Sequence, residues 1–473
     1  MKRFSITSQR VALPCGSDPD RLEVCAARIV VEGHRVLSVS RDSHPATDEE
    51  TEAYDFGDHL VTPAFINAHT HLALVGLRGS VGSEVARGNM VEELFYGWER
   101  RLTADDIRAL ARMGAYECLL SGTGMVWDHY FHADALVGAL RDTGLGGVVC
   151  PTLQDRSGPG VPQWEEQLDA TVRLANDPSL TPDAIGVGLG PHATDTVSAE
   201  LWQRCVELAR AHGLPIHAHC AQSLEEFERR YDEDGCSPVE WLQRLGVLDQ
   251  APSLLLVHML YVSRHDLERL APDRHRLGLC PYSQMAFAFP APVHLWHAMG
   301  LRWITATDAA ASNDSMSLQK ELRWIGGSRN AAIASSGAFD AFARSGSMDR
   351  ARELWALRGQ RHDAGAQIAH PQRLMASVWA EPGRLHPRMK AGAIAPGQLA
   401  NLVVWDTDHP SMWPTTDPLR ALAYNDTGAA IEAMWVAGRP IGQRGSFAQS
   451  IRESDSYREA RQEADERLRA LRV

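Results

Sequence analysis

Short apolar segments alternate with longer amphipathic stretches between about residues 60 and 315. The apolar segments are rich in β-branched residues, as buried strands are, and the stretches between them are long enough for helices. This alternation predicts a parallel (β/α)8 barrel of the TIM type, in the α/β class. The eight candidate strands are residues 60–69, 122–128, 145–153, 184–192, 215–220, 253–259, 276–281 and 302–308.

Two of the amphipathic stretches carry clear helix boundaries. One begins after Thr103, a favourable N-cap residue, and ends at Gly122. The other runs from Ser198 to Gly213, again between a capping hydroxyl and a glycine. Both have the length expected of barrel helices.

The segments outside the barrel have a different pattern. Residues 1–58 and 386–446 consist of short alternating strands with turn residues, so we expect both chain ends to form one small β-sandwich domain beside a barrel at 59–385. Residues 327–370 are helical by composition and could cap the barrel mouth. Residues 447–473 predict a charged, solvated C-terminal helix.

Composition limits the classes of partner. The chain has 473 residues, 44% of them hydrophobic and 23% charged, as in a globular protein. A formal net charge of -13 repels phosphate backbones, so we expect a small-molecule substrate and no nucleic acid. The N-terminus lacks an apolar leader and no run approaches the ~18 apolar residues of a membrane span. The eight cysteines form no CxxC pair, which favours reduced thiols and a cytoplasmic location.

Polar side chains follow the candidate strands where barrel chemistry is assembled. His69 and His71 flank one residue at the end of an apolar strand, so both imidazoles can face the same ion. Alone, such an HxH pair is a weak signal.

Other strand ends strengthen it. A second pair, His217 and His219, ends the fifth candidate strand, His258 ends the sixth and Asp308 ends the eighth. Because parallel barrel strands end on one face, these groups converge, and unpaired polar groups there would be costly. Three imidazoles and a carboxylate leave room for a bound water, as catalytic metal sites do. The sequence therefore predicts a catalytic metal centre.

Several stretches together resemble the amidohydrolase superfamily, in its branch of triazine chlorohydrolases, guanine and cytosine deaminases and adenosine-type deaminases. They are VTPAFINAHTHLALVGLRG, SGTGMVWDHY, GPHAT, HAHCAQSLEEF, LLVHMLYVSRHDLE, CPYSQM, ITATDAAASND and KAGAIAPGQLANLVVWD. These stretches span nearly the whole chain, and their order and spacing make the resemblance specific.

The resemblance implies specific roles. The metal ligands of the family fall on His69, His71, His219 and Asp308, and His258 would lie beside the metal-bound water. His217 then becomes a structural residue or a pocket wall. Asp308 would also accept the proton of the water, and His258 would orient the nucleophile or the developing oxyanion.

The resemblance also fixes the number of ions. Some relatives bridge two metals with a carboxylated lysine on the fourth strand, but no lysine occurs between positions 3 and 319. We therefore expect one divalent ion, with Zn²⁺ the default and Fe²⁺ or Co²⁺ compatible with the same ligands.

One position departs from the family. Deaminating relatives carry a proton-shuttling Glu three residues after the fifth-strand His, where this chain has Gln222. An amide does not exchange protons near neutral pH, and losing a general acid or base typically costs about 10²- to 10⁴-fold. An ordinary nucleobase deaminase is therefore not expected.

Three explanations stay open for Gln222. The enzyme could hydrolyse a C–N, amide-like or C–halogen centre of an aromatic or heteroaromatic small molecule whose leaving group needs no strong acid. It could instead be a cyclodehydratase that closes an aryl amide or ester into a benzoxazole-like ring in a natural-product pathway. Or Gln222 only binds substrate while a neighbour supplies the proton. A non-catalytic scaffold would have no need of the ligands.

Substrate contacts are expected from His192, Gln222 and Trp98. His192 matches a substrate-contacting histidine of relatives, although Thr194 and Asp195 replace the usual continuation of that motif. Trp98 lies with Tyr96, Met285 and Phe287 in loops that would overhang the barrel mouth, where they could stack a flat ligand or simply pack. Ser312 and Asn313 are expected to order the loop after Asp308. Relatives are commonly oligomers, so we expect a homodimer or larger.

Overall fold

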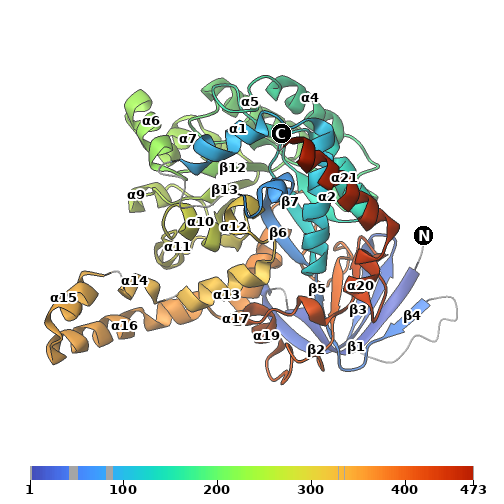
Figure 1. Ribbon diagram of the computed structural model, residues 1–473. Helices are drawn as coiled ribbons and strands as arrows, with labels where there is room; N and C mark the ends of the chain where they lie inside the picture. The colour runs from blue at the N-terminus through green and yellow to red at the C-terminus, as the bar shows by residue number, and fades with distance from the viewer. Residues whose placement is uncertain are drawn as a thin grey trace.

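A computed structural model describes residues 3–16, 18–41, 52–80, 89–328, 330–334 and 336–471. Figure 1 shows a helix-wrapped barrel above a smaller sheet that contains both blue and red strands, from the two ends of the chain. Among the helices in these ranges, none has the length and apolar character needed to span a bilayer. All eight cysteines are free thiols, and six of them are buried.

The barrel has eight parallel strands, two of which are interrupted, so ten segments form its wall. They are β6 (Phe65–Thr70), β7 (Thr123–Asp128), β8 (Gly146–Val149), β9 (Thr152–Leu153), β10 (Ile185–Val187), β11 (Gly190–Pro191), β12 (Ile216–Cys220), β13 (Leu254–His258), β14 (His275–Leu279) and β15 (Trp303–Thr305). Parallel bridges from Thr70 to Asp308 and from Leu189 to Ile216 join the two four-stranded halves. The barrel predicted from the alternating pattern is confirmed.

Helices cover the barrel, and the two with predicted boundaries form as expected. Thr103 caps α2 (Ala104–Leu120) through a reciprocal capping box with Asp106, and Ser198 caps α5 (Ala199–His212). Such caps stabilise a helix by about 1 kcal/mol each. The other helices up to the eighth strand are α1 (Tyr96–Glu99), α3 (Ala133–Thr143), α4 (Trp164–Ala175), α6 (Leu224–Asp234), α7 (Pro238–Arg244), α8 (Val247–Gln250), α9 (Arg264–Leu267), α10 (Pro281–Phe287) and α11 (Val293–Ala298).

The second sheet joins the two ends of the chain. Its order is β18-β17-β16-β5-β1-β2-β3, with β4 beside β1. Its strands are β1 (Arg3–Cys15), β2 (Asp18–Glu32), β3 (Arg35–Ser40), β4 (Glu52–Asp55), β5 (Leu60–Pro63), β16 (Leu402–Trp405), β17 (Ile431–Val436) and β18 (Arg439–Ile441). We call it the chain-end sheet.

The segment 60–69, predicted as one barrel strand, is divided between the two sheets. β5 pairs with β1 and with β16 in the chain-end sheet, and β6 begins the barrel after Ala64. The domain boundaries given above stay proposals, and the pairing of β5 favours placing the first of them after Pro63.

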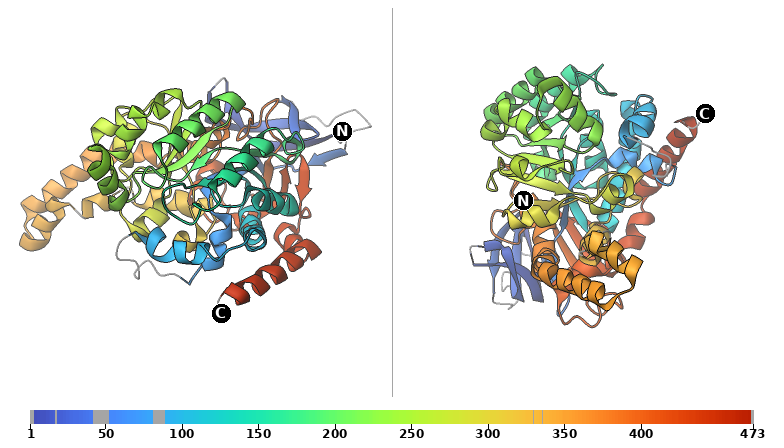
Figure 2. Two further views of the ribbon diagram at one scale, coloured as in Figure 1. Left: turned by 90° about the horizontal axis from the view of Figure 1, so that it is seen from above. Right: turned by 90° about the vertical axis from the view of Figure 1, so that its left-hand side faces the viewer.

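The remaining helices follow the eighth barrel strand. They are α12 (Ala310–Asn313), α13 (Leu318–Ser328), α14 (Ala331–Ala334), α15 (Gly337–Ser345), α16 (Met348–Ile368), α17 (Pro371–Val378), α18 (Ala380–Gly383), α19 (Pro418–Tyr424), α20 (Phe447–Arg452) and α21 (Asp455–Leu471). The helical arm, defined as α15 and α16, projects from the body of the molecule (Figures 1 and 2). The C-terminal helix α21 is charged on its outer face but packs on α2 through Ala460 and Ala464.

Candidate metal centre

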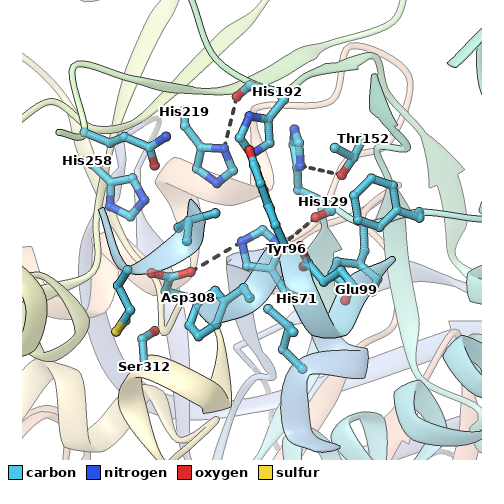
Figure 3. Close-up of a pocket in the computed structure, with 17 residues that line it drawn as sticks. His71, Tyr96, Glu99, His129, Thr152, His192, His219, His258, Asp308 and Ser312 are labelled. Atoms are coloured by element: carbon cyan, nitrogen blue, oxygen red, sulfur yellow. Dashed lines mark hydrogen bonds and ion pairs between the residues drawn. The ribbon is translucent and has the colours of Figure 1, made fainter. Parts of the chain in front are cut away.

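A small pocket lies at the carboxyl ends of the barrel strands and contains a cluster of histidines (Figure 3). Its enclosed volume is about 50 Å³. Apolar side chains from the segment before α1, including Val91 and Phe95, line it together with His71, His219 and Asp308. The pocket therefore combines polar and apolar lining groups.

His69 and His71 each have one ring nitrogen fixed by the protein. His69 Nδ1 lies 2.8 Å from His217 Nε2, and His71 Nδ1 donates to the carbonyl oxygen of His129 at 2.6 Å. Both rings therefore present Nε2 to the same space. His69 Nε2 is buried without a hydrogen-bond partner among the described residues, which is costly unless an ion satisfies it.

The turn that carries His71 is held by a buried carboxylate on the neighbouring strand. Asp128, at the end of β7, accepts from Thr70 Oγ1 at 3.0 Å and from the Leu72 N–H at 2.7 Å. Burial raises the pKa of Asp128 to about 6, against these hydrogen bonds and the nearby His71. This contact fixes the direction in which the second imidazole points.

Asp308 follows β15 and pairs with Thr70 of β6 at the junction between the two four-stranded halves of the barrel. Its Oδ1 lies 3.5 Å from His69 Nε2 and 3.4 Å from His71 Nε2. Ligands held 2.0–2.1 Å from one tetrahedral ion lie about 3.3 Å apart, so this spacing fits a shared ion. Asp308 Oδ2 accepts from Ser283 Oγ at 2.7 Å, which orients the carboxylate.

His219 supplies the third imidazole from the end of β12. Its Nδ1 donates to the carbonyl oxygen of His192 at 3.0 Å, so Nε2 is again the nitrogen left for an ion. Ligating atoms of His69, His219 and His258 all lie within 4.8 Å of one another. The structure therefore brings the four predicted metal ligands together, and their role as ligands stays a prediction.

The predicted ligands differ in protonation. Burial lowers the pKa of His69, and it lowers that of His219 well below its usual range. Burial also opposes protonation of His71, but the hydrogen bond and the charge of Asp308 raise the pKa of that ring. Burial also opposes ionisation of Asp308, but contacts with His69 and His71 hold the pKa of that carboxyl well below its ordinary value. Neutral imidazoles and a carboxylate are the forms that bind Zn²⁺ and similar ions.

His258 lies beside this cluster at the end of β13. Its ring stacks on that of His219 at 5.4 Å with 10° between the planes, and its Nδ1 lies 3.3 Å from Gln284 Nε2. Burial lowers the pKa of His258 to about 3, so the ring is neutral. The left-handed φ values of His258 (78°) and Asp308 (64°) are unusual for such residues and point to backbone held in place for function.

Gln222 lines the pocket two residues after β12. Its backbone N–H donates to Glu226 Oε2 at 2.8 Å, and the other oxygen of Glu226 accepts from Thr194 Oγ1. Glu226 is buried and outside the pocket lining, so it cannot replace the missing acid at position 222.

Comparison with known proteins decides the family. The sequence profile of the Amidohydrolase family matches residues 60–340, more than half of the chain. The chain belongs to the amidohydrolase family. A 5-methylthioadenosine/S-adenosylhomocysteine deaminase of Halobacterium salinarum is 30% identical over 390 residues, 81% of each chain.

Solved structures agree with this fold. An adenosine deaminase from Xanthomonas campestris with bound zinc has a TM-score of 0.76 at 20% identity, covering 99% of this chain and 98% of its own. Atrazine chlorohydrolase from Arthrobacter aurescens, complexed with zinc, has a TM-score of 0.78 at 18% identity, covering 98% and 100%. The amidohydrolase fold, a barrel with a smaller domain from both chain ends, is thereby confirmed.

The structure places the predicted substrate residues differently. His192 and Tyr96 line the amidohydrolase pocket together with Gln222. Trp98 does not: its ring lies against Gly76 and packs, partly buried, on the hydrophobic core. This placement corrects the expectation that Trp98 overhangs the substrate. Met285 lines a different cavity, and the side chain of Phe287 lies outside the described residues.

The insertion at 327–370 does not cap the mouth of the metal pocket. None of its described residues lines that pocket, and its arm projects away from the barrel. Ser312 and Asn313 do order the loop after Asp308: Asn313 Nδ2 donates to the carbonyl oxygen of Thr307 at 2.7 Å, and Ser312 Oγ lies 2.6 Å from Ser283 Oγ.

Three further residues of the site were missed from the sequence. His129 lines the pocket, with Nδ1 3.0 Å from Thr152 Oγ1 and a buried Nε2 that has no hydrogen-bond partner among the residues described. It directly follows a barrel strand, so the rule that found His69 could have found it. Glu99 lines the pocket too, and burial raises its pKa to about 7. Ser283 had only its place in CPYSQM as a signal.

Proposed function

We propose that this amidohydrolase is a mononuclear hydrolase that attacks a C–N, amide-like or C–halogen carbon of an aromatic or heteroaromatic small molecule. Two observations support the proposal: Asp308 Oδ1 lies 3.5 Å from His69 Nε2 and 3.4 Å from His71 Nε2, and ligand atoms of His69 and His219 lie within 4.8 Å of each other. The similar proteins are a deaminase of an adenine nucleoside and a chlorohydrolase of atrazine, which supports a heteroaromatic carbon with a leaving group as the target.

His69, His71, His219 and Asp308 would hold one divalent ion, and we propose Zn²⁺, with Fe²⁺ or Co²⁺ compatible. When bound, such an ion supplies an activated water as the nucleophile and polarises the bond under attack. The absence of lysine from 3 to 319 supports a single ion, because no carboxylated lysine can bridge a second one.

The chain's own residues then divide the work. Asp308 keeps one oxygen in the hydrogen bond from Ser283 and can accept the proton of the attacking water with the other. His258, neutral and fixed by Gln284, can hydrogen-bond the nucleophile or the oxygen or nitrogen on which charge develops.

The substrate itself would meet both polar and apolar groups. His192, Gln222 and Glu99 offer hydrogen bonds to ring nitrogens or substituents, while Val91, Phe95 and Tyr96 can cover a flat ring. Gln222 orients substrate in this proposal and transfers no proton.

The test compares wild type, Asp308→Ala and Gln222→Glu after reconstitution with zinc. The panel contains 5'-methylthioadenosine, 5'-deoxyadenosine, guanine, a chlorotriazine and a set of aryl amides. We expect wild type to bind one equivalent of zinc by elemental analysis and to hydrolyse a panel member. Asp308→Ala should lose at least about 10³-fold in turnover. The surface variant Asp142→Asn is the matched control and should behave as wild type.

Gln222→Glu separates the alternatives. If Gln222 reflects a substrate that needs no strong acid, the variant gains deamination of purines by up to about 10²- to 10⁴-fold while amide or halide hydrolysis changes little. A wild type that hydrolyses nothing but closes ortho-substituted aryl amides with loss of water would replace our proposal by the cyclodehydratase, which the comparisons do not support. A chain that binds none of zinc, iron and cobalt would overturn both.

We also propose that the protein is a homodimer or larger assembly and that it works in a reducing cytoplasm. Sedimentation velocity of the zinc-loaded protein tests the oligomeric state.

A further inference from the structure

A second, larger cavity lies beside the metal pocket, between α10, α11, α13 and α16. Its volume is about 890 Å³, within the ~300–1,000 Å³ of small-molecule sites and far above the metal pocket. Most of its wall is apolar, from the side chains of Pro281, Met285, Val293, Trp324, Ala364 and Ile368. The insertion that carries the helical arm therefore builds one wall of this cavity.

The apolar wall contains a cationic group. Arg361 on α16 lines the cavity opposite His294 on α11. Burial lowers the pKa of His294, and the charge of Arg361 lowers it further, so the guanidinium faces a neutral ring. In the part of the chain that the structure describes, no carboxylate forms an ion pair with Arg361. A guanidinium on an apolar surface is suited to a carboxylate ligand.

One helix contacts both the cavity and the metal centre. Helix α10 presents Pro281, Gln284 and Met285 to the cavity, while its Ser283 donates to Asp308 Oδ2. Gln284 faces His258 through Nε2, and its Oε1 is buried without a partner among the described residues. A polar atom left in this state beside an apolar cavity indicates a place for a donor from a ligand.

The shape favours a small molecule over a protein segment. Ile368 and Gln284 are buried (4% and 0% exposed), so the cavity reaches into the core instead of lying flat on the surface. The exposed large apolar residues of the arm, Phe339, Met348 and Trp355, are not among the residues that line it. A single guanidinium within a deep apolar wall matches one acidic group on a flat or branched carbon body.

We propose that this cavity binds a small organic acid with an aromatic body, whose anionic group pairs with Arg361 and whose rings lie among α10, α11 and α13. The site is separate from the metal pocket, and its ligand contacts the same helix that orients Asp308 and His258. It stands independently of the reaction proposed above.

Two fluorescent probes with the same aromatic body test the proposal on the zinc-loaded full chain. 1-Anilinonaphthalene-8-sulfonate carries an anionic group, and N-phenyl-1-naphthylamine lacks it. We expect the anionic probe to saturate near one equivalent. Arg361→Gln should weaken it by about tenfold, as loss of a partly buried ion pair does, and change the neutral probe little.

Two substitutions that fill the cavity from opposite walls provide a second test. Ala364→Phe on α16 and Val293→Phe on α11 should each abolish binding of both probes, because a ring then occupies their space. Arg358→Gln is the matched control: Arg358 lies one turn from Arg361 and stacks on the exposed Trp355, so both probes should bind as to wild type. Zinc content and thermal midpoint identify a variant that fails to fold.

Several results would overturn the proposal. They are binding of many equivalents without saturation, equal weakening of both probes in Arg361→Gln, or full binding in both filling variants. A wild-type dimer that becomes a monomer in Ala364→Phe would show that a second copy of the chain occupies the cavity instead.

Discussion

Ser283 contacts the candidate metal centre only through another residue. Its hydroxyl donates to the one oxygen of Asp308 that faces away from His69 and His71, and so fixes the rotation of that carboxylate. Groups that orient a metal ligand contribute to metal affinity without touching the ion. The side chain of Ser283 is fully buried, so solvent does not replace the contact when it is lost.

We therefore expect Ser283→Ala to lower zinc affinity by about 10- to 100-fold while the fold persists. Competition with a chelator of known affinity measures the change. Ser377→Ala is the matched control, because Ser377 is a buried serine bonded to Thr305 Oγ1 outside the pocket. Equal losses of zinc affinity in the two variants would show that Ser283 acts through general stability alone.

At the residue scale, the sequence predicted the residues of the candidate metal centre but few of the residues around it. His69, His219 and Asp308 could be placed together because parallel barrel strands end on one face, whatever the loops do. Glu99 lies on a short helix whose path over the mouth no periodicity reveals. Trp98, its neighbour, packs on the core for the same reason.

Among the elements, α6 shows how a buried carboxylate can anchor a helix beside the site. Glu226 accepts from the backbone N–H of Gln222 and from Thr194 Oγ1. Burial, followed by the nearby Asp195 carboxylate, raises the pKa of Glu226 from 4.5 to about 7. The folded state therefore holds this proton more tightly than the unfolded chain does.

The raised pKa of Glu226 makes the stability of the protein fall as the pH rises. The contribution of Glu226 to the free energy of unfolding is complete below about pH 4.5 and is lost as the pH rises through about 7. Relative to Glu226→Gln, wild type should lose on the order of 2 kcal/mol across that window. Urea unfolding at several pH values measures the difference. Glu228→Gln, an exposed change on the same helix, should run parallel to wild type, and parallel curves for Glu226→Gln as well would contradict the assignment.

The hydrophobic pattern of the sequence does not predict where one strand ends and the next begins. Residues 60–69 form one largely apolar stretch that is buried throughout, yet β5 pairs with β1 and β16 while β6 pairs with β7. A strand can leave one sheet and enter the next without any change of residue type, because both environments are buried. Only the pairing partners, which are distant in sequence, distinguish the two halves.

On the scale of the whole molecule, a partly buried ion-pair network connects the chain-end sheet to the barrel. Glu381, fully buried, accepts from Arg276 at 2.8 Å and from Arg302 at 2.7 Å. Arg302 also pairs with Asp20 on β2, so one guanidinium bridges the two parts. Removing one member of such a network leaves charges buried without compensation.

We expect Glu381→Ala to destabilise the protein by about 3–5 kcal/mol, because it removes the carboxylate that pairs with the buried Arg276. The free energy of unfolding in urea, measured on zinc-loaded protein, tests this. Glu353→Ala, which removes an exposed partner of Arg350 on the arm, should cost no more than about 1 kcal/mol. A loss as small in Glu381→Ala would mean that water reaches the network.

The pairing of β5 with β16 also sets the order of events during synthesis. β5 is synthesised early, but its second neighbour, β16, is made only after every barrel strand, so one edge of β5 stays unpaired until residue 402 has been added. An open edge with buried-type side chains recruits other chains. A nascent chain halted before residue 402 would therefore expose an unpaired, aggregation-prone strand edge. Pairing of β16 with β5 removes that edge once the last strands have been made.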